Sequence, residues 1–383
     1  MKNVIIFGDD HYNALGVARV FGVNEIKPCG LLVVPKDKEQ LCYAKYSKYW
    51  KTIWFVENEQ EGIALLLKMG SSDKQVLIPT SDRAETALDN NLDVLNPFYY
   101  LPGMRNTQGA VSALMDKYQQ SKWAESLGLK TAKTWLHTLG EDIPSDLRFP
   151  CFLKPVASSE GDKRDIRKCD CLDDLNNALA ELQEKHYWRI LIQEYLHKDY
   201  EMELWGCIPK YSPKIPYLLS RHLREWPVVG GSVSCHQFLL DADIRAEAEK
   251  ILYAIRDEGY TGNIDIELFM IQGEIYLNEV NFRNSGDVYA CFNNKVFYPL
   301  IWYKDIIGED VSSMNTEYSD KYYAMNEITD FKQVVFGNLS LGKWLHYVTH
   351  CKDFAFFFPT DKKPGLICVR GIFQRKLHKL FGF

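Results

Sequence analysis

The stretch YTGNIDIELFMIQGEIYLNEVNF, residues 260–282, predicts an antiparallel hairpin. Two strand-like runs, IDIELFM and IYLNEVN, flank the turn signal QGE. Such a hairpin can bring Glu267 and Glu279 onto one face. Asn281 lies two residues beyond Glu279, so strand alternation puts it on that same face.

Glu267, Glu279 and Asn281 are therefore candidate metal ligands. Two carboxylates and an amide oxygen are hard ligands that suit Mg²⁺ (or Mn²⁺) shared with nucleotide phosphates. Acidic side chains on a hairpin usually belong to a face that is exposed to solvent. Here they stand inside apolar strands, where an unpaired carboxylate is costly, and this favours the metal site.

Candidate nucleotide ligands precede the hairpin. Lys154 ends the strand-like run FPCFLK, and Lys117 lies in a predicted helix before it. Lysines suit phosphate as point charges. A lysine is by default a surface residue, but Lys154 closes an apolar strand ahead of a polar loop. In the QEYL segment, Glu194 and exposed backbone groups can pair with an adenine edge, and Glu201 can accept ribose hydroxyls.

The first 105 residues alternate short apolar runs with helical stretches. VIIFG (4–8), CGLLVV (29–34) and QVLIPT (75–80) predict strands of a parallel α/β unit. Ligands bind in the crevice beyond the strand ends of such a sheet. Polar residues that either cap helices or face one cleft follow two of the strands: Asp9, Asp10, His11 and Asn13, then Thr80, Ser81, Asp82 and Arg83. Gly8 lacks the companion glycines of a dinucleotide fingerprint.

A loop with Pro102 and Gly103 ends this unit. The periodicity then predicts a helix from about Val111 to Leu127, a strand at 149–156, a helix at 173–185, and strands at 189–196 and 201–208.

The order of these motifs resembles that of ATP-grasp enzymes. The matching positions are Asp116-Lys117, Lys154-Pro155, Gln193 to Leu196 with Glu201, and Glu267 with Asn278 to Arg283. The run from Asn278 to Gly286 is similar to the metal-binding strand of the ATP-grasp purine carboxylase subunit. The runs NALGVAR (13–19), IPTSD (78–82) and RHLREWP (221–227) resemble the D-aspartate-ligase-like, carbamoyl-phosphate-synthase-related branch. The likeness covers about residues 1–310, and its specificity comes from the ordered combination.

The resemblance implies a role for each matching residue. Lys117 and Lys154 would hold the ATP phosphates. Glu194 and the backbone of Tyr195 and Leu196 would hold adenine, and Glu201 would hold ribose. Magnesium would be held by Glu267, Glu279 and Asn281. Arg283 would steady the transferring phosphoryl group or an acyl phosphate. Because the arginine guanidinium can form a bidentate hydrogen-bonded pair with a carboxylate, we also consider Arg221, Arg224 and Arg283 as candidates for binding a substrate. Their alternative is structural ion pairing with acids such as Glu225.

The expected fold class is α/β (α+β), an ATP-grasp fold preceded by a Rossmann-like parallel domain. The expected parts are the N-terminal domain (1–105), a lid (106–192), a catalytic part with the metal site (193–308) and a C-terminal extension (309–383). One feature departs from the resemblance. Many ATP-grasp proteins have a glycine-rich phosphate loop after the lysine strand, whereas Val156 to Lys168 contains only Gly161, beside Lys163, Arg164, Arg167 and Lys168.

The implied reaction joins a small-molecule carboxylate to an amine through an acyl phosphate, giving ADP and phosphate. Two alternatives stay open. One is a carboxylase that acts through carboxyphosphate, and the other is an ATP-binding regulatory protein without catalysis.

Composition argues against several classes of protein. The net charge of −6 and the pI of about 5.9 disfavour a broad nucleic-acid surface. The apolar run in MKNVIIFGDD is too short for a signal-peptide core, and no stretch reaches a membrane-spanning length. The ten cysteines are scattered without a disulfide framework, so we expect reduced thiols in a cytoplasmic protein.

The tail from Asp361 to Phe383 combines basic residues with apolar residues at helical spacing. Such a helix either docks its apolar face on the domain, which we favour, or makes weak contact with an anionic membrane surface. His346, His350 and Cys351 either share a helix face as metal ligands or, as we favour, form an ordinary helix surface.

Overall fold

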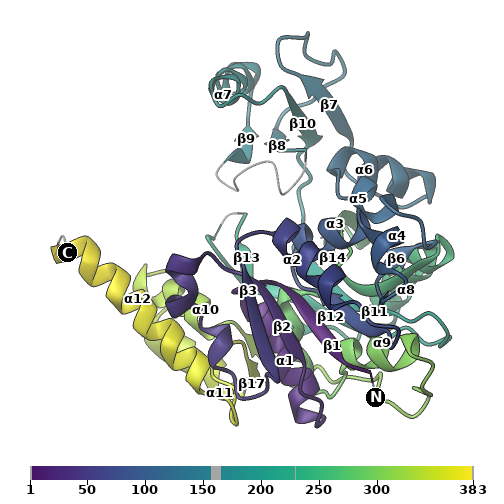
Figure 1. Cartoon of the computed structure of the whole chain (residues 1–383). Helices are drawn as coiled ribbons and strands as arrows, with labels where there is room; N and C mark the ends of the chain where they lie inside the picture. The colour runs from purple at the N-terminus through teal and green to yellow at the C-terminus, as the bar shows by residue number, and fades with distance from the viewer. Residues whose placement is uncertain (1, 157–164, 229, 382–383) are drawn as a thin grey trace.

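The computed structural model describes residues 2–156, 165–228 and 230–381, with side chains up to residue 374. These residues form three sheets (Figure 1). A parallel sheet and a large, mostly antiparallel sheet, in which only the β16–β17 pair of the described strands is parallel, make up the body of the molecule. A smaller antiparallel sheet stands apart from them at the top of the view.

The N-terminal sheet is parallel, as the alternation of strands and helices predicted. Its strands are β1 (Val4–Asp9), β2 (Cys29–Val33), β3 (Thr52–Val56), β4 (Gln75–Pro79) and β5 (Tyr99–Tyr100), in the order β3-β2-β1-β4-β5. Strands β3 and β5 were not predicted from the sequence. The helical segments are α1 (Tyr12–Val23), η1 (Lys36–Leu41), η2 (Ala44–Tyr46), α2 (Glu59–Met69), α3 (Asp82–Asp89) and α4 (Leu92–Leu95). Both faces of β1 are buried, since Val4 and Ile6 pack with α1 while Ile5 and Phe7 pack with α2 and α3.

The small sheet has the order β7-β10-β8-β9 and is antiparallel. This lid comprises α5 (Ala110–Leu114), α6 (Lys117–Ser126), β7 (Thr134–Thr138), β8 (Cys151–Lys154), β9 (Arg167–Cys169), α7 (Leu172–Glu184) and β10 (Arg189–Glu194). The single helix predicted from Val111 to Leu127 is in fact two. Asp116 interrupts it, because its carboxylate caps the new helix by accepting hydrogen bonds from the backbone of Tyr118 and Gln119.

The large sheet contains the predicted hairpin. Its strands are β11 (Tyr200–Ile208), β12 (Tyr217–Trp226), β13 (Ser232–Phe238), β14 (Tyr260–Ile271), β15 (Glu274–Asn281), β16 (Tyr323–Met325) and β17 (Cys351–Phe354), in the order β15-β14-β11-β12-β13-β16-β17, and β6 (Gly103–Met104) pairs with β14. The helical segments of this part are α8 (Ala242–Asp257), η4 (Gly286–Cys291), α9 (Tyr298–Ile306), α10 (Glu327–Val335), α11 (Leu341–His350) and α12 (Lys363–Phe381). Gln272 and Gly273 form the turn of the hairpin with positive φ angles of 51° and 82°.

Residues from the expected C-terminal extension are part of the body of the protein, since β16 and β17 extend the large sheet. A buried ion pair joins this region to the N-terminal domain. The guanidinium of Arg19 on α1 donates to the Asp361 carboxylate at 3.0 Å and to the carbonyls of Ala355 and Phe356. Asp361 also accepts a hydrogen bond from Ser47 at 2.7 Å.

Helix α12 follows directly and runs along one edge of the molecule (Figure 1). Pro364 and Gly365 in its first turn are buried, but Leu366 and Phe373 are 60% and 63% exposed. The start of the tail therefore contacts the body of the protein, whereas Phe373 of the expected apolar face is exposed, and the docking of that face stays a prediction. The predicted contributions of Arg375, Lys376, Leu377, Lys379, Leu380 and Phe381 lie outside the described side chains. Within the part of the chain that was described, no helix is both long and apolar enough to cross a membrane.

His346, His350 and Cys351 do not gather as metal ligands. His346 and His350 are exposed on α11, whereas Cys351 is buried in β17 beside Cys235. The interpretation as a helix surface is the one that fits the two histidines.

We predict that Arg19→Met lowers the free energy of unfolding by about 3–5 kcal/mol, because it leaves the Asp361 carboxylate buried without its counterion. Denaturant unfolding followed by circular dichroism measures the change. The matched control is Arg105→Met, which breaks an exposed pair with Glu258 and should cost about 1 kcal/mol or less. Equal losses of unfolding free energy in the two variants would contradict the role of Arg19 in joining the C-terminal region to the N-terminal domain.

Candidate active site

The β14–β15 hairpin places two glutamates directly opposite each other. Glu267 pairs with Glu279 in register, and Asp265 pairs with Asn281 in the neighbouring row. A bulge follows Glu267 and leaves Asn278 as the extra residue of β15. Burial and the charge of Glu279 raise the pKa of Glu267. Like charges in this position repel, so the hairpin needs cations beside it.

Lys117 supplies one of these cations. Its ammonium donates a hydrogen bond to the Glu279 carboxylate at 2.8 Å. Burial raises the pKa of Glu279, but the charge and hydrogen bond of Lys117 outweigh burial and lower it. The position of Lys117 is fixed because Gln120, one turn further along α6, exchanges two hydrogen bonds with the backbone of Val280, at 2.7 and 2.8 Å.

Lys154 supplies the second cation from the end of β8. Its ammonium lies 3.5 Å from the Asn278 side-chain oxygen, and Asn278 donates in turn to Glu267 at 2.9 Å. Burial, with the charge of Lys117, lowers the pKa of Lys154 to about 8. Lys117, Lys154, Asn278 and Glu279 line one cavity between the lid and the hairpin, together with Gln193 of β10. We call it the lid cavity.

The expected adenine residues lie where the lid joins the large sheet. Glu194 ends β10, and Tyr195 and Leu196 begin the connection to β11. The Tyr195 ring packs against Phe152, and the Lys168 ammonium lies 4.9 Å from its centroid. This connection starts two residues after Gln193, which lines the lid cavity.

A second cavity of about 340 Å³ lies between the N-terminal sheet and the large sheet, and we call it the acidic cavity. The expectation that two strand ends face one cleft is met, since Asp9, His11, Asn13, Thr80, Ser81 and Asp82 all line it. His11 and Ser81 also cap α1 and α3, so both interpretations of these residues hold. Asp10 and Arg83 lie outside the lining. Asp10 accepts hydrogen bonds from Cys42 and the Ala44 backbone instead.

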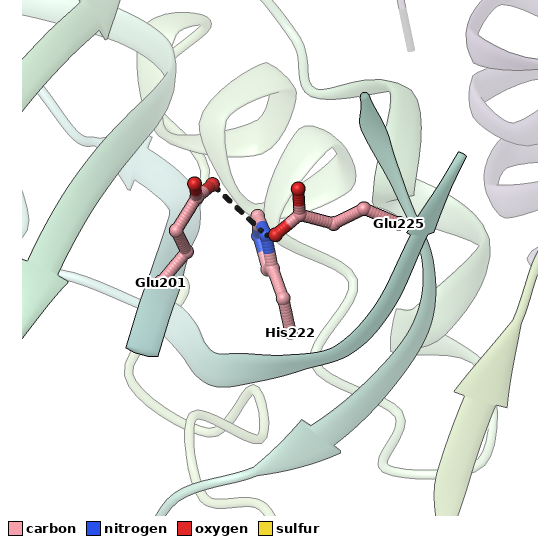
Figure 2. A group of neighbouring side chains, drawn as sticks. All are labelled: Glu201, His222 and Glu225. Atoms are coloured by element: carbon pink, nitrogen blue, oxygen red, sulfur yellow. Dashed lines mark hydrogen bonds and ion pairs between the residues drawn. The ribbon is translucent and has the colours of Figure 1, made fainter. Parts of the chain in front are cut away.

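Glu201, Glu267 and Arg283 also line the acidic cavity. Figure 2 shows the carboxylates of Glu201 on β11 and Glu225 on β12 turned towards the same His222 ring, each 3.3 Å from its Nδ1 atom. Burial lowers the pKa of His222, but its hydrogen bonds to Glu203 and Glu225 outweigh burial and raise it to about 9. A protonated His222 therefore balances part of the surrounding negative charge at neutral pH.

Arg283 is held by two acids of different domains. Its Nε donates to Asp82, the first residue of α3, at 3.0 Å, and its Nη1 pairs with the buried Asp265 of β14. This bridge fixes the guanidinium at the wall of the acidic cavity.

Arg224 is placed away from both cavities. Its guanidinium forms a two-pronged pair with the fully buried Asp330 of α10, at 2.8 and 2.9 Å, and stacks 4.2 Å from the Tyr347 ring. The structure thus does not bring Arg224 to the other candidate residues, and its contacts are those of a structural ion pair. Arg221 likewise donates to Gln237 on the neighbouring strand.

The sequence analysis did not single out Glu203, His222, Asp265 and Asp287 as site residues, although all of them line the acidic cavity. Glu203 and Asp265 carried a usable signal, since each stands two residues from a selected glutamate in an alternating strand. Gly161, Lys163 and Arg164 of the predicted phosphate loop lie outside the described residues. Gly231 lines the acidic cavity in a tight turn, where a Cβ atom would come within 2.0 Å of the Pro227 carbonyl oxygen.

Comparison with known proteins gives distant relatives in sequence and many in structure. No protein-family model matches the chain. A segment of 185 residues, 45% of the chain, is 26% identical to formate-dependent phosphoribosylglycinamide formyltransferase of a Nitratiruptor species. The match spans 45% of that enzyme, less than half of its length.

Three solved structures illustrate the structural likeness. The N5-carboxyaminoimidazole synthetase of Staphylococcus aureus with ADP has a TM-score of 0.66 at 16% identity, over 89% of this chain and 87% of that one. The L-amino acid ligase of Bacillus licheniformis has a TM-score of 0.63 at 13% sequence identity, over 84% of this chain and 78% of that one. The biotin carboxylase domain of Hydrogenobacter thermophilus 2-oxoglutarate carboxylase has a TM-score of 0.62 at 15% sequence identity, over 84% of this chain and 73% of that one. At these identities the likeness establishes the fold, and the predicted fold class is confirmed: the chain has the ATP-grasp fold, preceded by a parallel α/β domain.

Proposed function

We propose that the protein is an ATP-dependent carboxylate–amine ligase that forms ADP and phosphate. The observation that carries the proposal is that Lys117, Lys154 and Glu279 line the lid cavity, with Glu267 directly opposite Glu279 on the neighbouring strand. Phosphates that share a divalent ion need cationic and carboxylate side chains at one place. Solved structures with this fold include complexes with ADP, ATP and MgADP.

The side chains present fit a nucleotide with Mg²⁺. Glu267, Glu279 and Asn281 would hold the ion, which would neutralise phosphate charge. The two lysines would bind the phosphates, and Lys117 would exchange its hydrogen bond to Glu279 for one to a phosphate oxygen. Glu194 and the backbone of Tyr195 and Leu196 would hold adenine. Glu201 would bind ribose after leaving its present partners, Lys198 and His222.

The proposed reaction passes through an acyl phosphate because phosphate is a better leaving group than the oxygen of a free carboxylate. A carboxylate oxygen attacks the γ-phosphorus of ATP and the bond to ADP breaks, which gives an acyl phosphate. The amine, after losing a proton, attacks the acyl carbon, and phosphate leaves as the amide forms. Arg283, at the wall of the acidic cavity, is placed to stabilise negative charge on the reacting groups. The lid would exclude water from the intermediate.

The charge of the acidic cavity supports an amine as the acceptor. Its lining carries the carboxylates of Asp9, Asp82, Glu201, Glu203, Asp265, Glu267 and Asp287 against two cations, the guanidinium of Arg283 and the imidazolium of His222. Such a lining attracts an ammonium group and repels a phosphorylated acceptor. The L-amino acid ligase among the structural neighbours is in keeping with this substrate class.

A carboxylase that acts through carboxyphosphate is the second candidate, because a biotin carboxylase domain is also among the neighbours. It requires bicarbonate-dependent ATP hydrolysis without an organic acid. A regulatory protein without catalysis requires MgATP binding with no turnover under any substrate pool. An assay of ADP and phosphate release with pooled carboxylic acids and amines, run with and without bicarbonate, separates the three functions. Release of AMP would contradict all of them.

We predict that Glu279→Gln abolishes turnover in this assay while the protein stays folded, because the substitution removes a charge that the divalent ion needs. The matched control is Glu274→Gln, which makes the same change on the same strand at an exposed residue paired with Lys130. The control should retain near-normal turnover. Near-normal turnover in Glu279→Gln would exclude Glu279 from the metal site.

We predict that MgATP binding takes up a proton above pH 8. In the free protein Lys154 loses its charge as the pH rises through about 8, whereas the bound phosphates favour the charged ammonium. Affinity should therefore fall by up to about tenfold per pH unit above pH 8. Calorimetry at pH 8.5–9 in buffers of different ionisation enthalpy measures the uptake.

Lys154→Arg is the control for this effect, since a guanidinium stays charged throughout. Equal proton uptake in the two proteins would show that Lys154 is not the titrating group.

A further inference from the structure

Three buried side chains from three elements converge beside the acidic cavity, apart from the residues assigned to nucleotide and magnesium. They are Glu203 of β11, His236 of β13 and Asp287 of η4. One ligand atom of each lies within 4.8 Å of the other two. The residues are only 6%, 0% and 5% exposed, and Glu203 and Asp287 line the cavity.

Neighbouring side chains fix the orientation of the His236 imidazole. Its Nδ1 lies 2.9 Å from the Ser220 hydroxyl, and the ring packs against Trp205 at a centroid distance of 5.2 Å. This arrangement turns the Nε2 atom towards Asp287 Oδ1, at 3.2 Å. A hydrogen bond to the far nitrogen is the usual way in which proteins fix a histidine that ligates a metal.

The facing atoms are close but not hydrogen-bonded. Within the described part of the chain, His236 Nε2 and Asp287 Oδ1 have no hydrogen-bond partner, although both are fully buried. If the ring merely donated to the carboxylate, its N–H would point at the oxygen. The two atoms lie at ion-pair distance, and together with the Glu203 carboxylate they are close enough to ligate one ion.

Charge points to the same conclusion. Glu203 and Asp287 bring two carboxylates together in the interior, where each faces one imidazole: His222 lies 3.5 Å from Glu203 and His236 lies 3.2 Å from Asp287. A divalent ion would balance both charges. The neighbouring group of Glu201, His222 and Glu225, drawn in Figure 2, differs. It is less buried, and Lys198 already pairs with Glu201.

We propose that Glu203, His236 and Asp287 bind a divalent transition-metal ion of the Zn²⁺ or Mn²⁺ class. An imidazole among the ligands favours such ions over Mg²⁺ and Ca²⁺. Three protein ligands leave a coordination position open, as in catalytic rather than structural sites. Because Glu203 and Asp287 line the acidic cavity, the open position is available to an oxygen or nitrogen atom of a substrate there. The site shares no residue with the proposed magnesium ligands and does not depend on the ligase reaction.

Metal binding without nucleotide tests the proposal. The full-length protein is stripped with a chelator, dialysed, and titrated with Zn²⁺ by calorimetry and with Co²⁺ by visible absorption. The expected result is one tight ion per chain, with a visible Co²⁺ band from imidazole and carboxylate ligation. Absence of tight binding of either ion to the folded wild-type protein would overturn the proposal.

Variants locate the ion. His236→Gln should weaken binding by about 100-fold or more, and Ser220→Ala, which removes only the group that orients the ring, by about 10–100-fold. Glu279→Gln in the proposed magnesium site and His346→Gln on the exposed α11 should leave the affinity unchanged. Tight binding that survives both His236→Gln and Ser220→Ala, or that is lost in His346→Gln, would overturn the proposal. If His236→Gln does not fold, Ser220→Ala and the wild-type titration decide.

Discussion

The opposition of Glu267 and Glu279 is the constraint around which the site is organised. Two carboxylates in register on neighbouring strands repel each other, and burial makes their repulsion more costly. The register extends across the sheet, since Glu203 pairs with Glu267 and Ser220 pairs with Glu203. The lid supplies Lys117 and Lys154, and Gln120 holds α6 against β15. In this arrangement Lys117 neutralises Glu279, and in the proposed function a divalent ion would replace it.

The local parts of this arrangement could be predicted from the sequence. Alternation in residues 260–282 and the QGE turn gave the hairpin and the face shared by Glu267 and Glu279, because side-chain direction in a strand depends on local spacing alone. The polar residues that follow β1 and β4 likewise indicated a shared cleft, since parallel strands end at one edge of a sheet.

The partners of the charged groups could not be predicted in the same way. Arg224 pairs with Asp330 and Arg19 with Asp361, across 106 and 342 residues of sequence, and no local pattern links such residues. The break at Asp116 was missed because the apolar spacing continues through it, while the cap depends on the conformation of one residue. The short strands β16 and β17 carry too few residues for their alternation to be recognised.

The two cavities divide the proposed reaction between them, with phosphate held at the lid cavity and the organic groups in the acidic cavity. The central claim is that Glu267 and Glu279 hold the ion that accompanies ATP. A crystal structure with a non-hydrolysable ATP analogue and Mn²⁺ tests it most directly, because anomalous scattering locates the ion independently of the protein. The account predicts an anomalous peak between Glu267 and Glu279, with Lys117 turned from Glu279 to a phosphate. Nucleotide bound elsewhere, or an intact Lys117–Glu279 pair with no ion between the two glutamates, would contradict it.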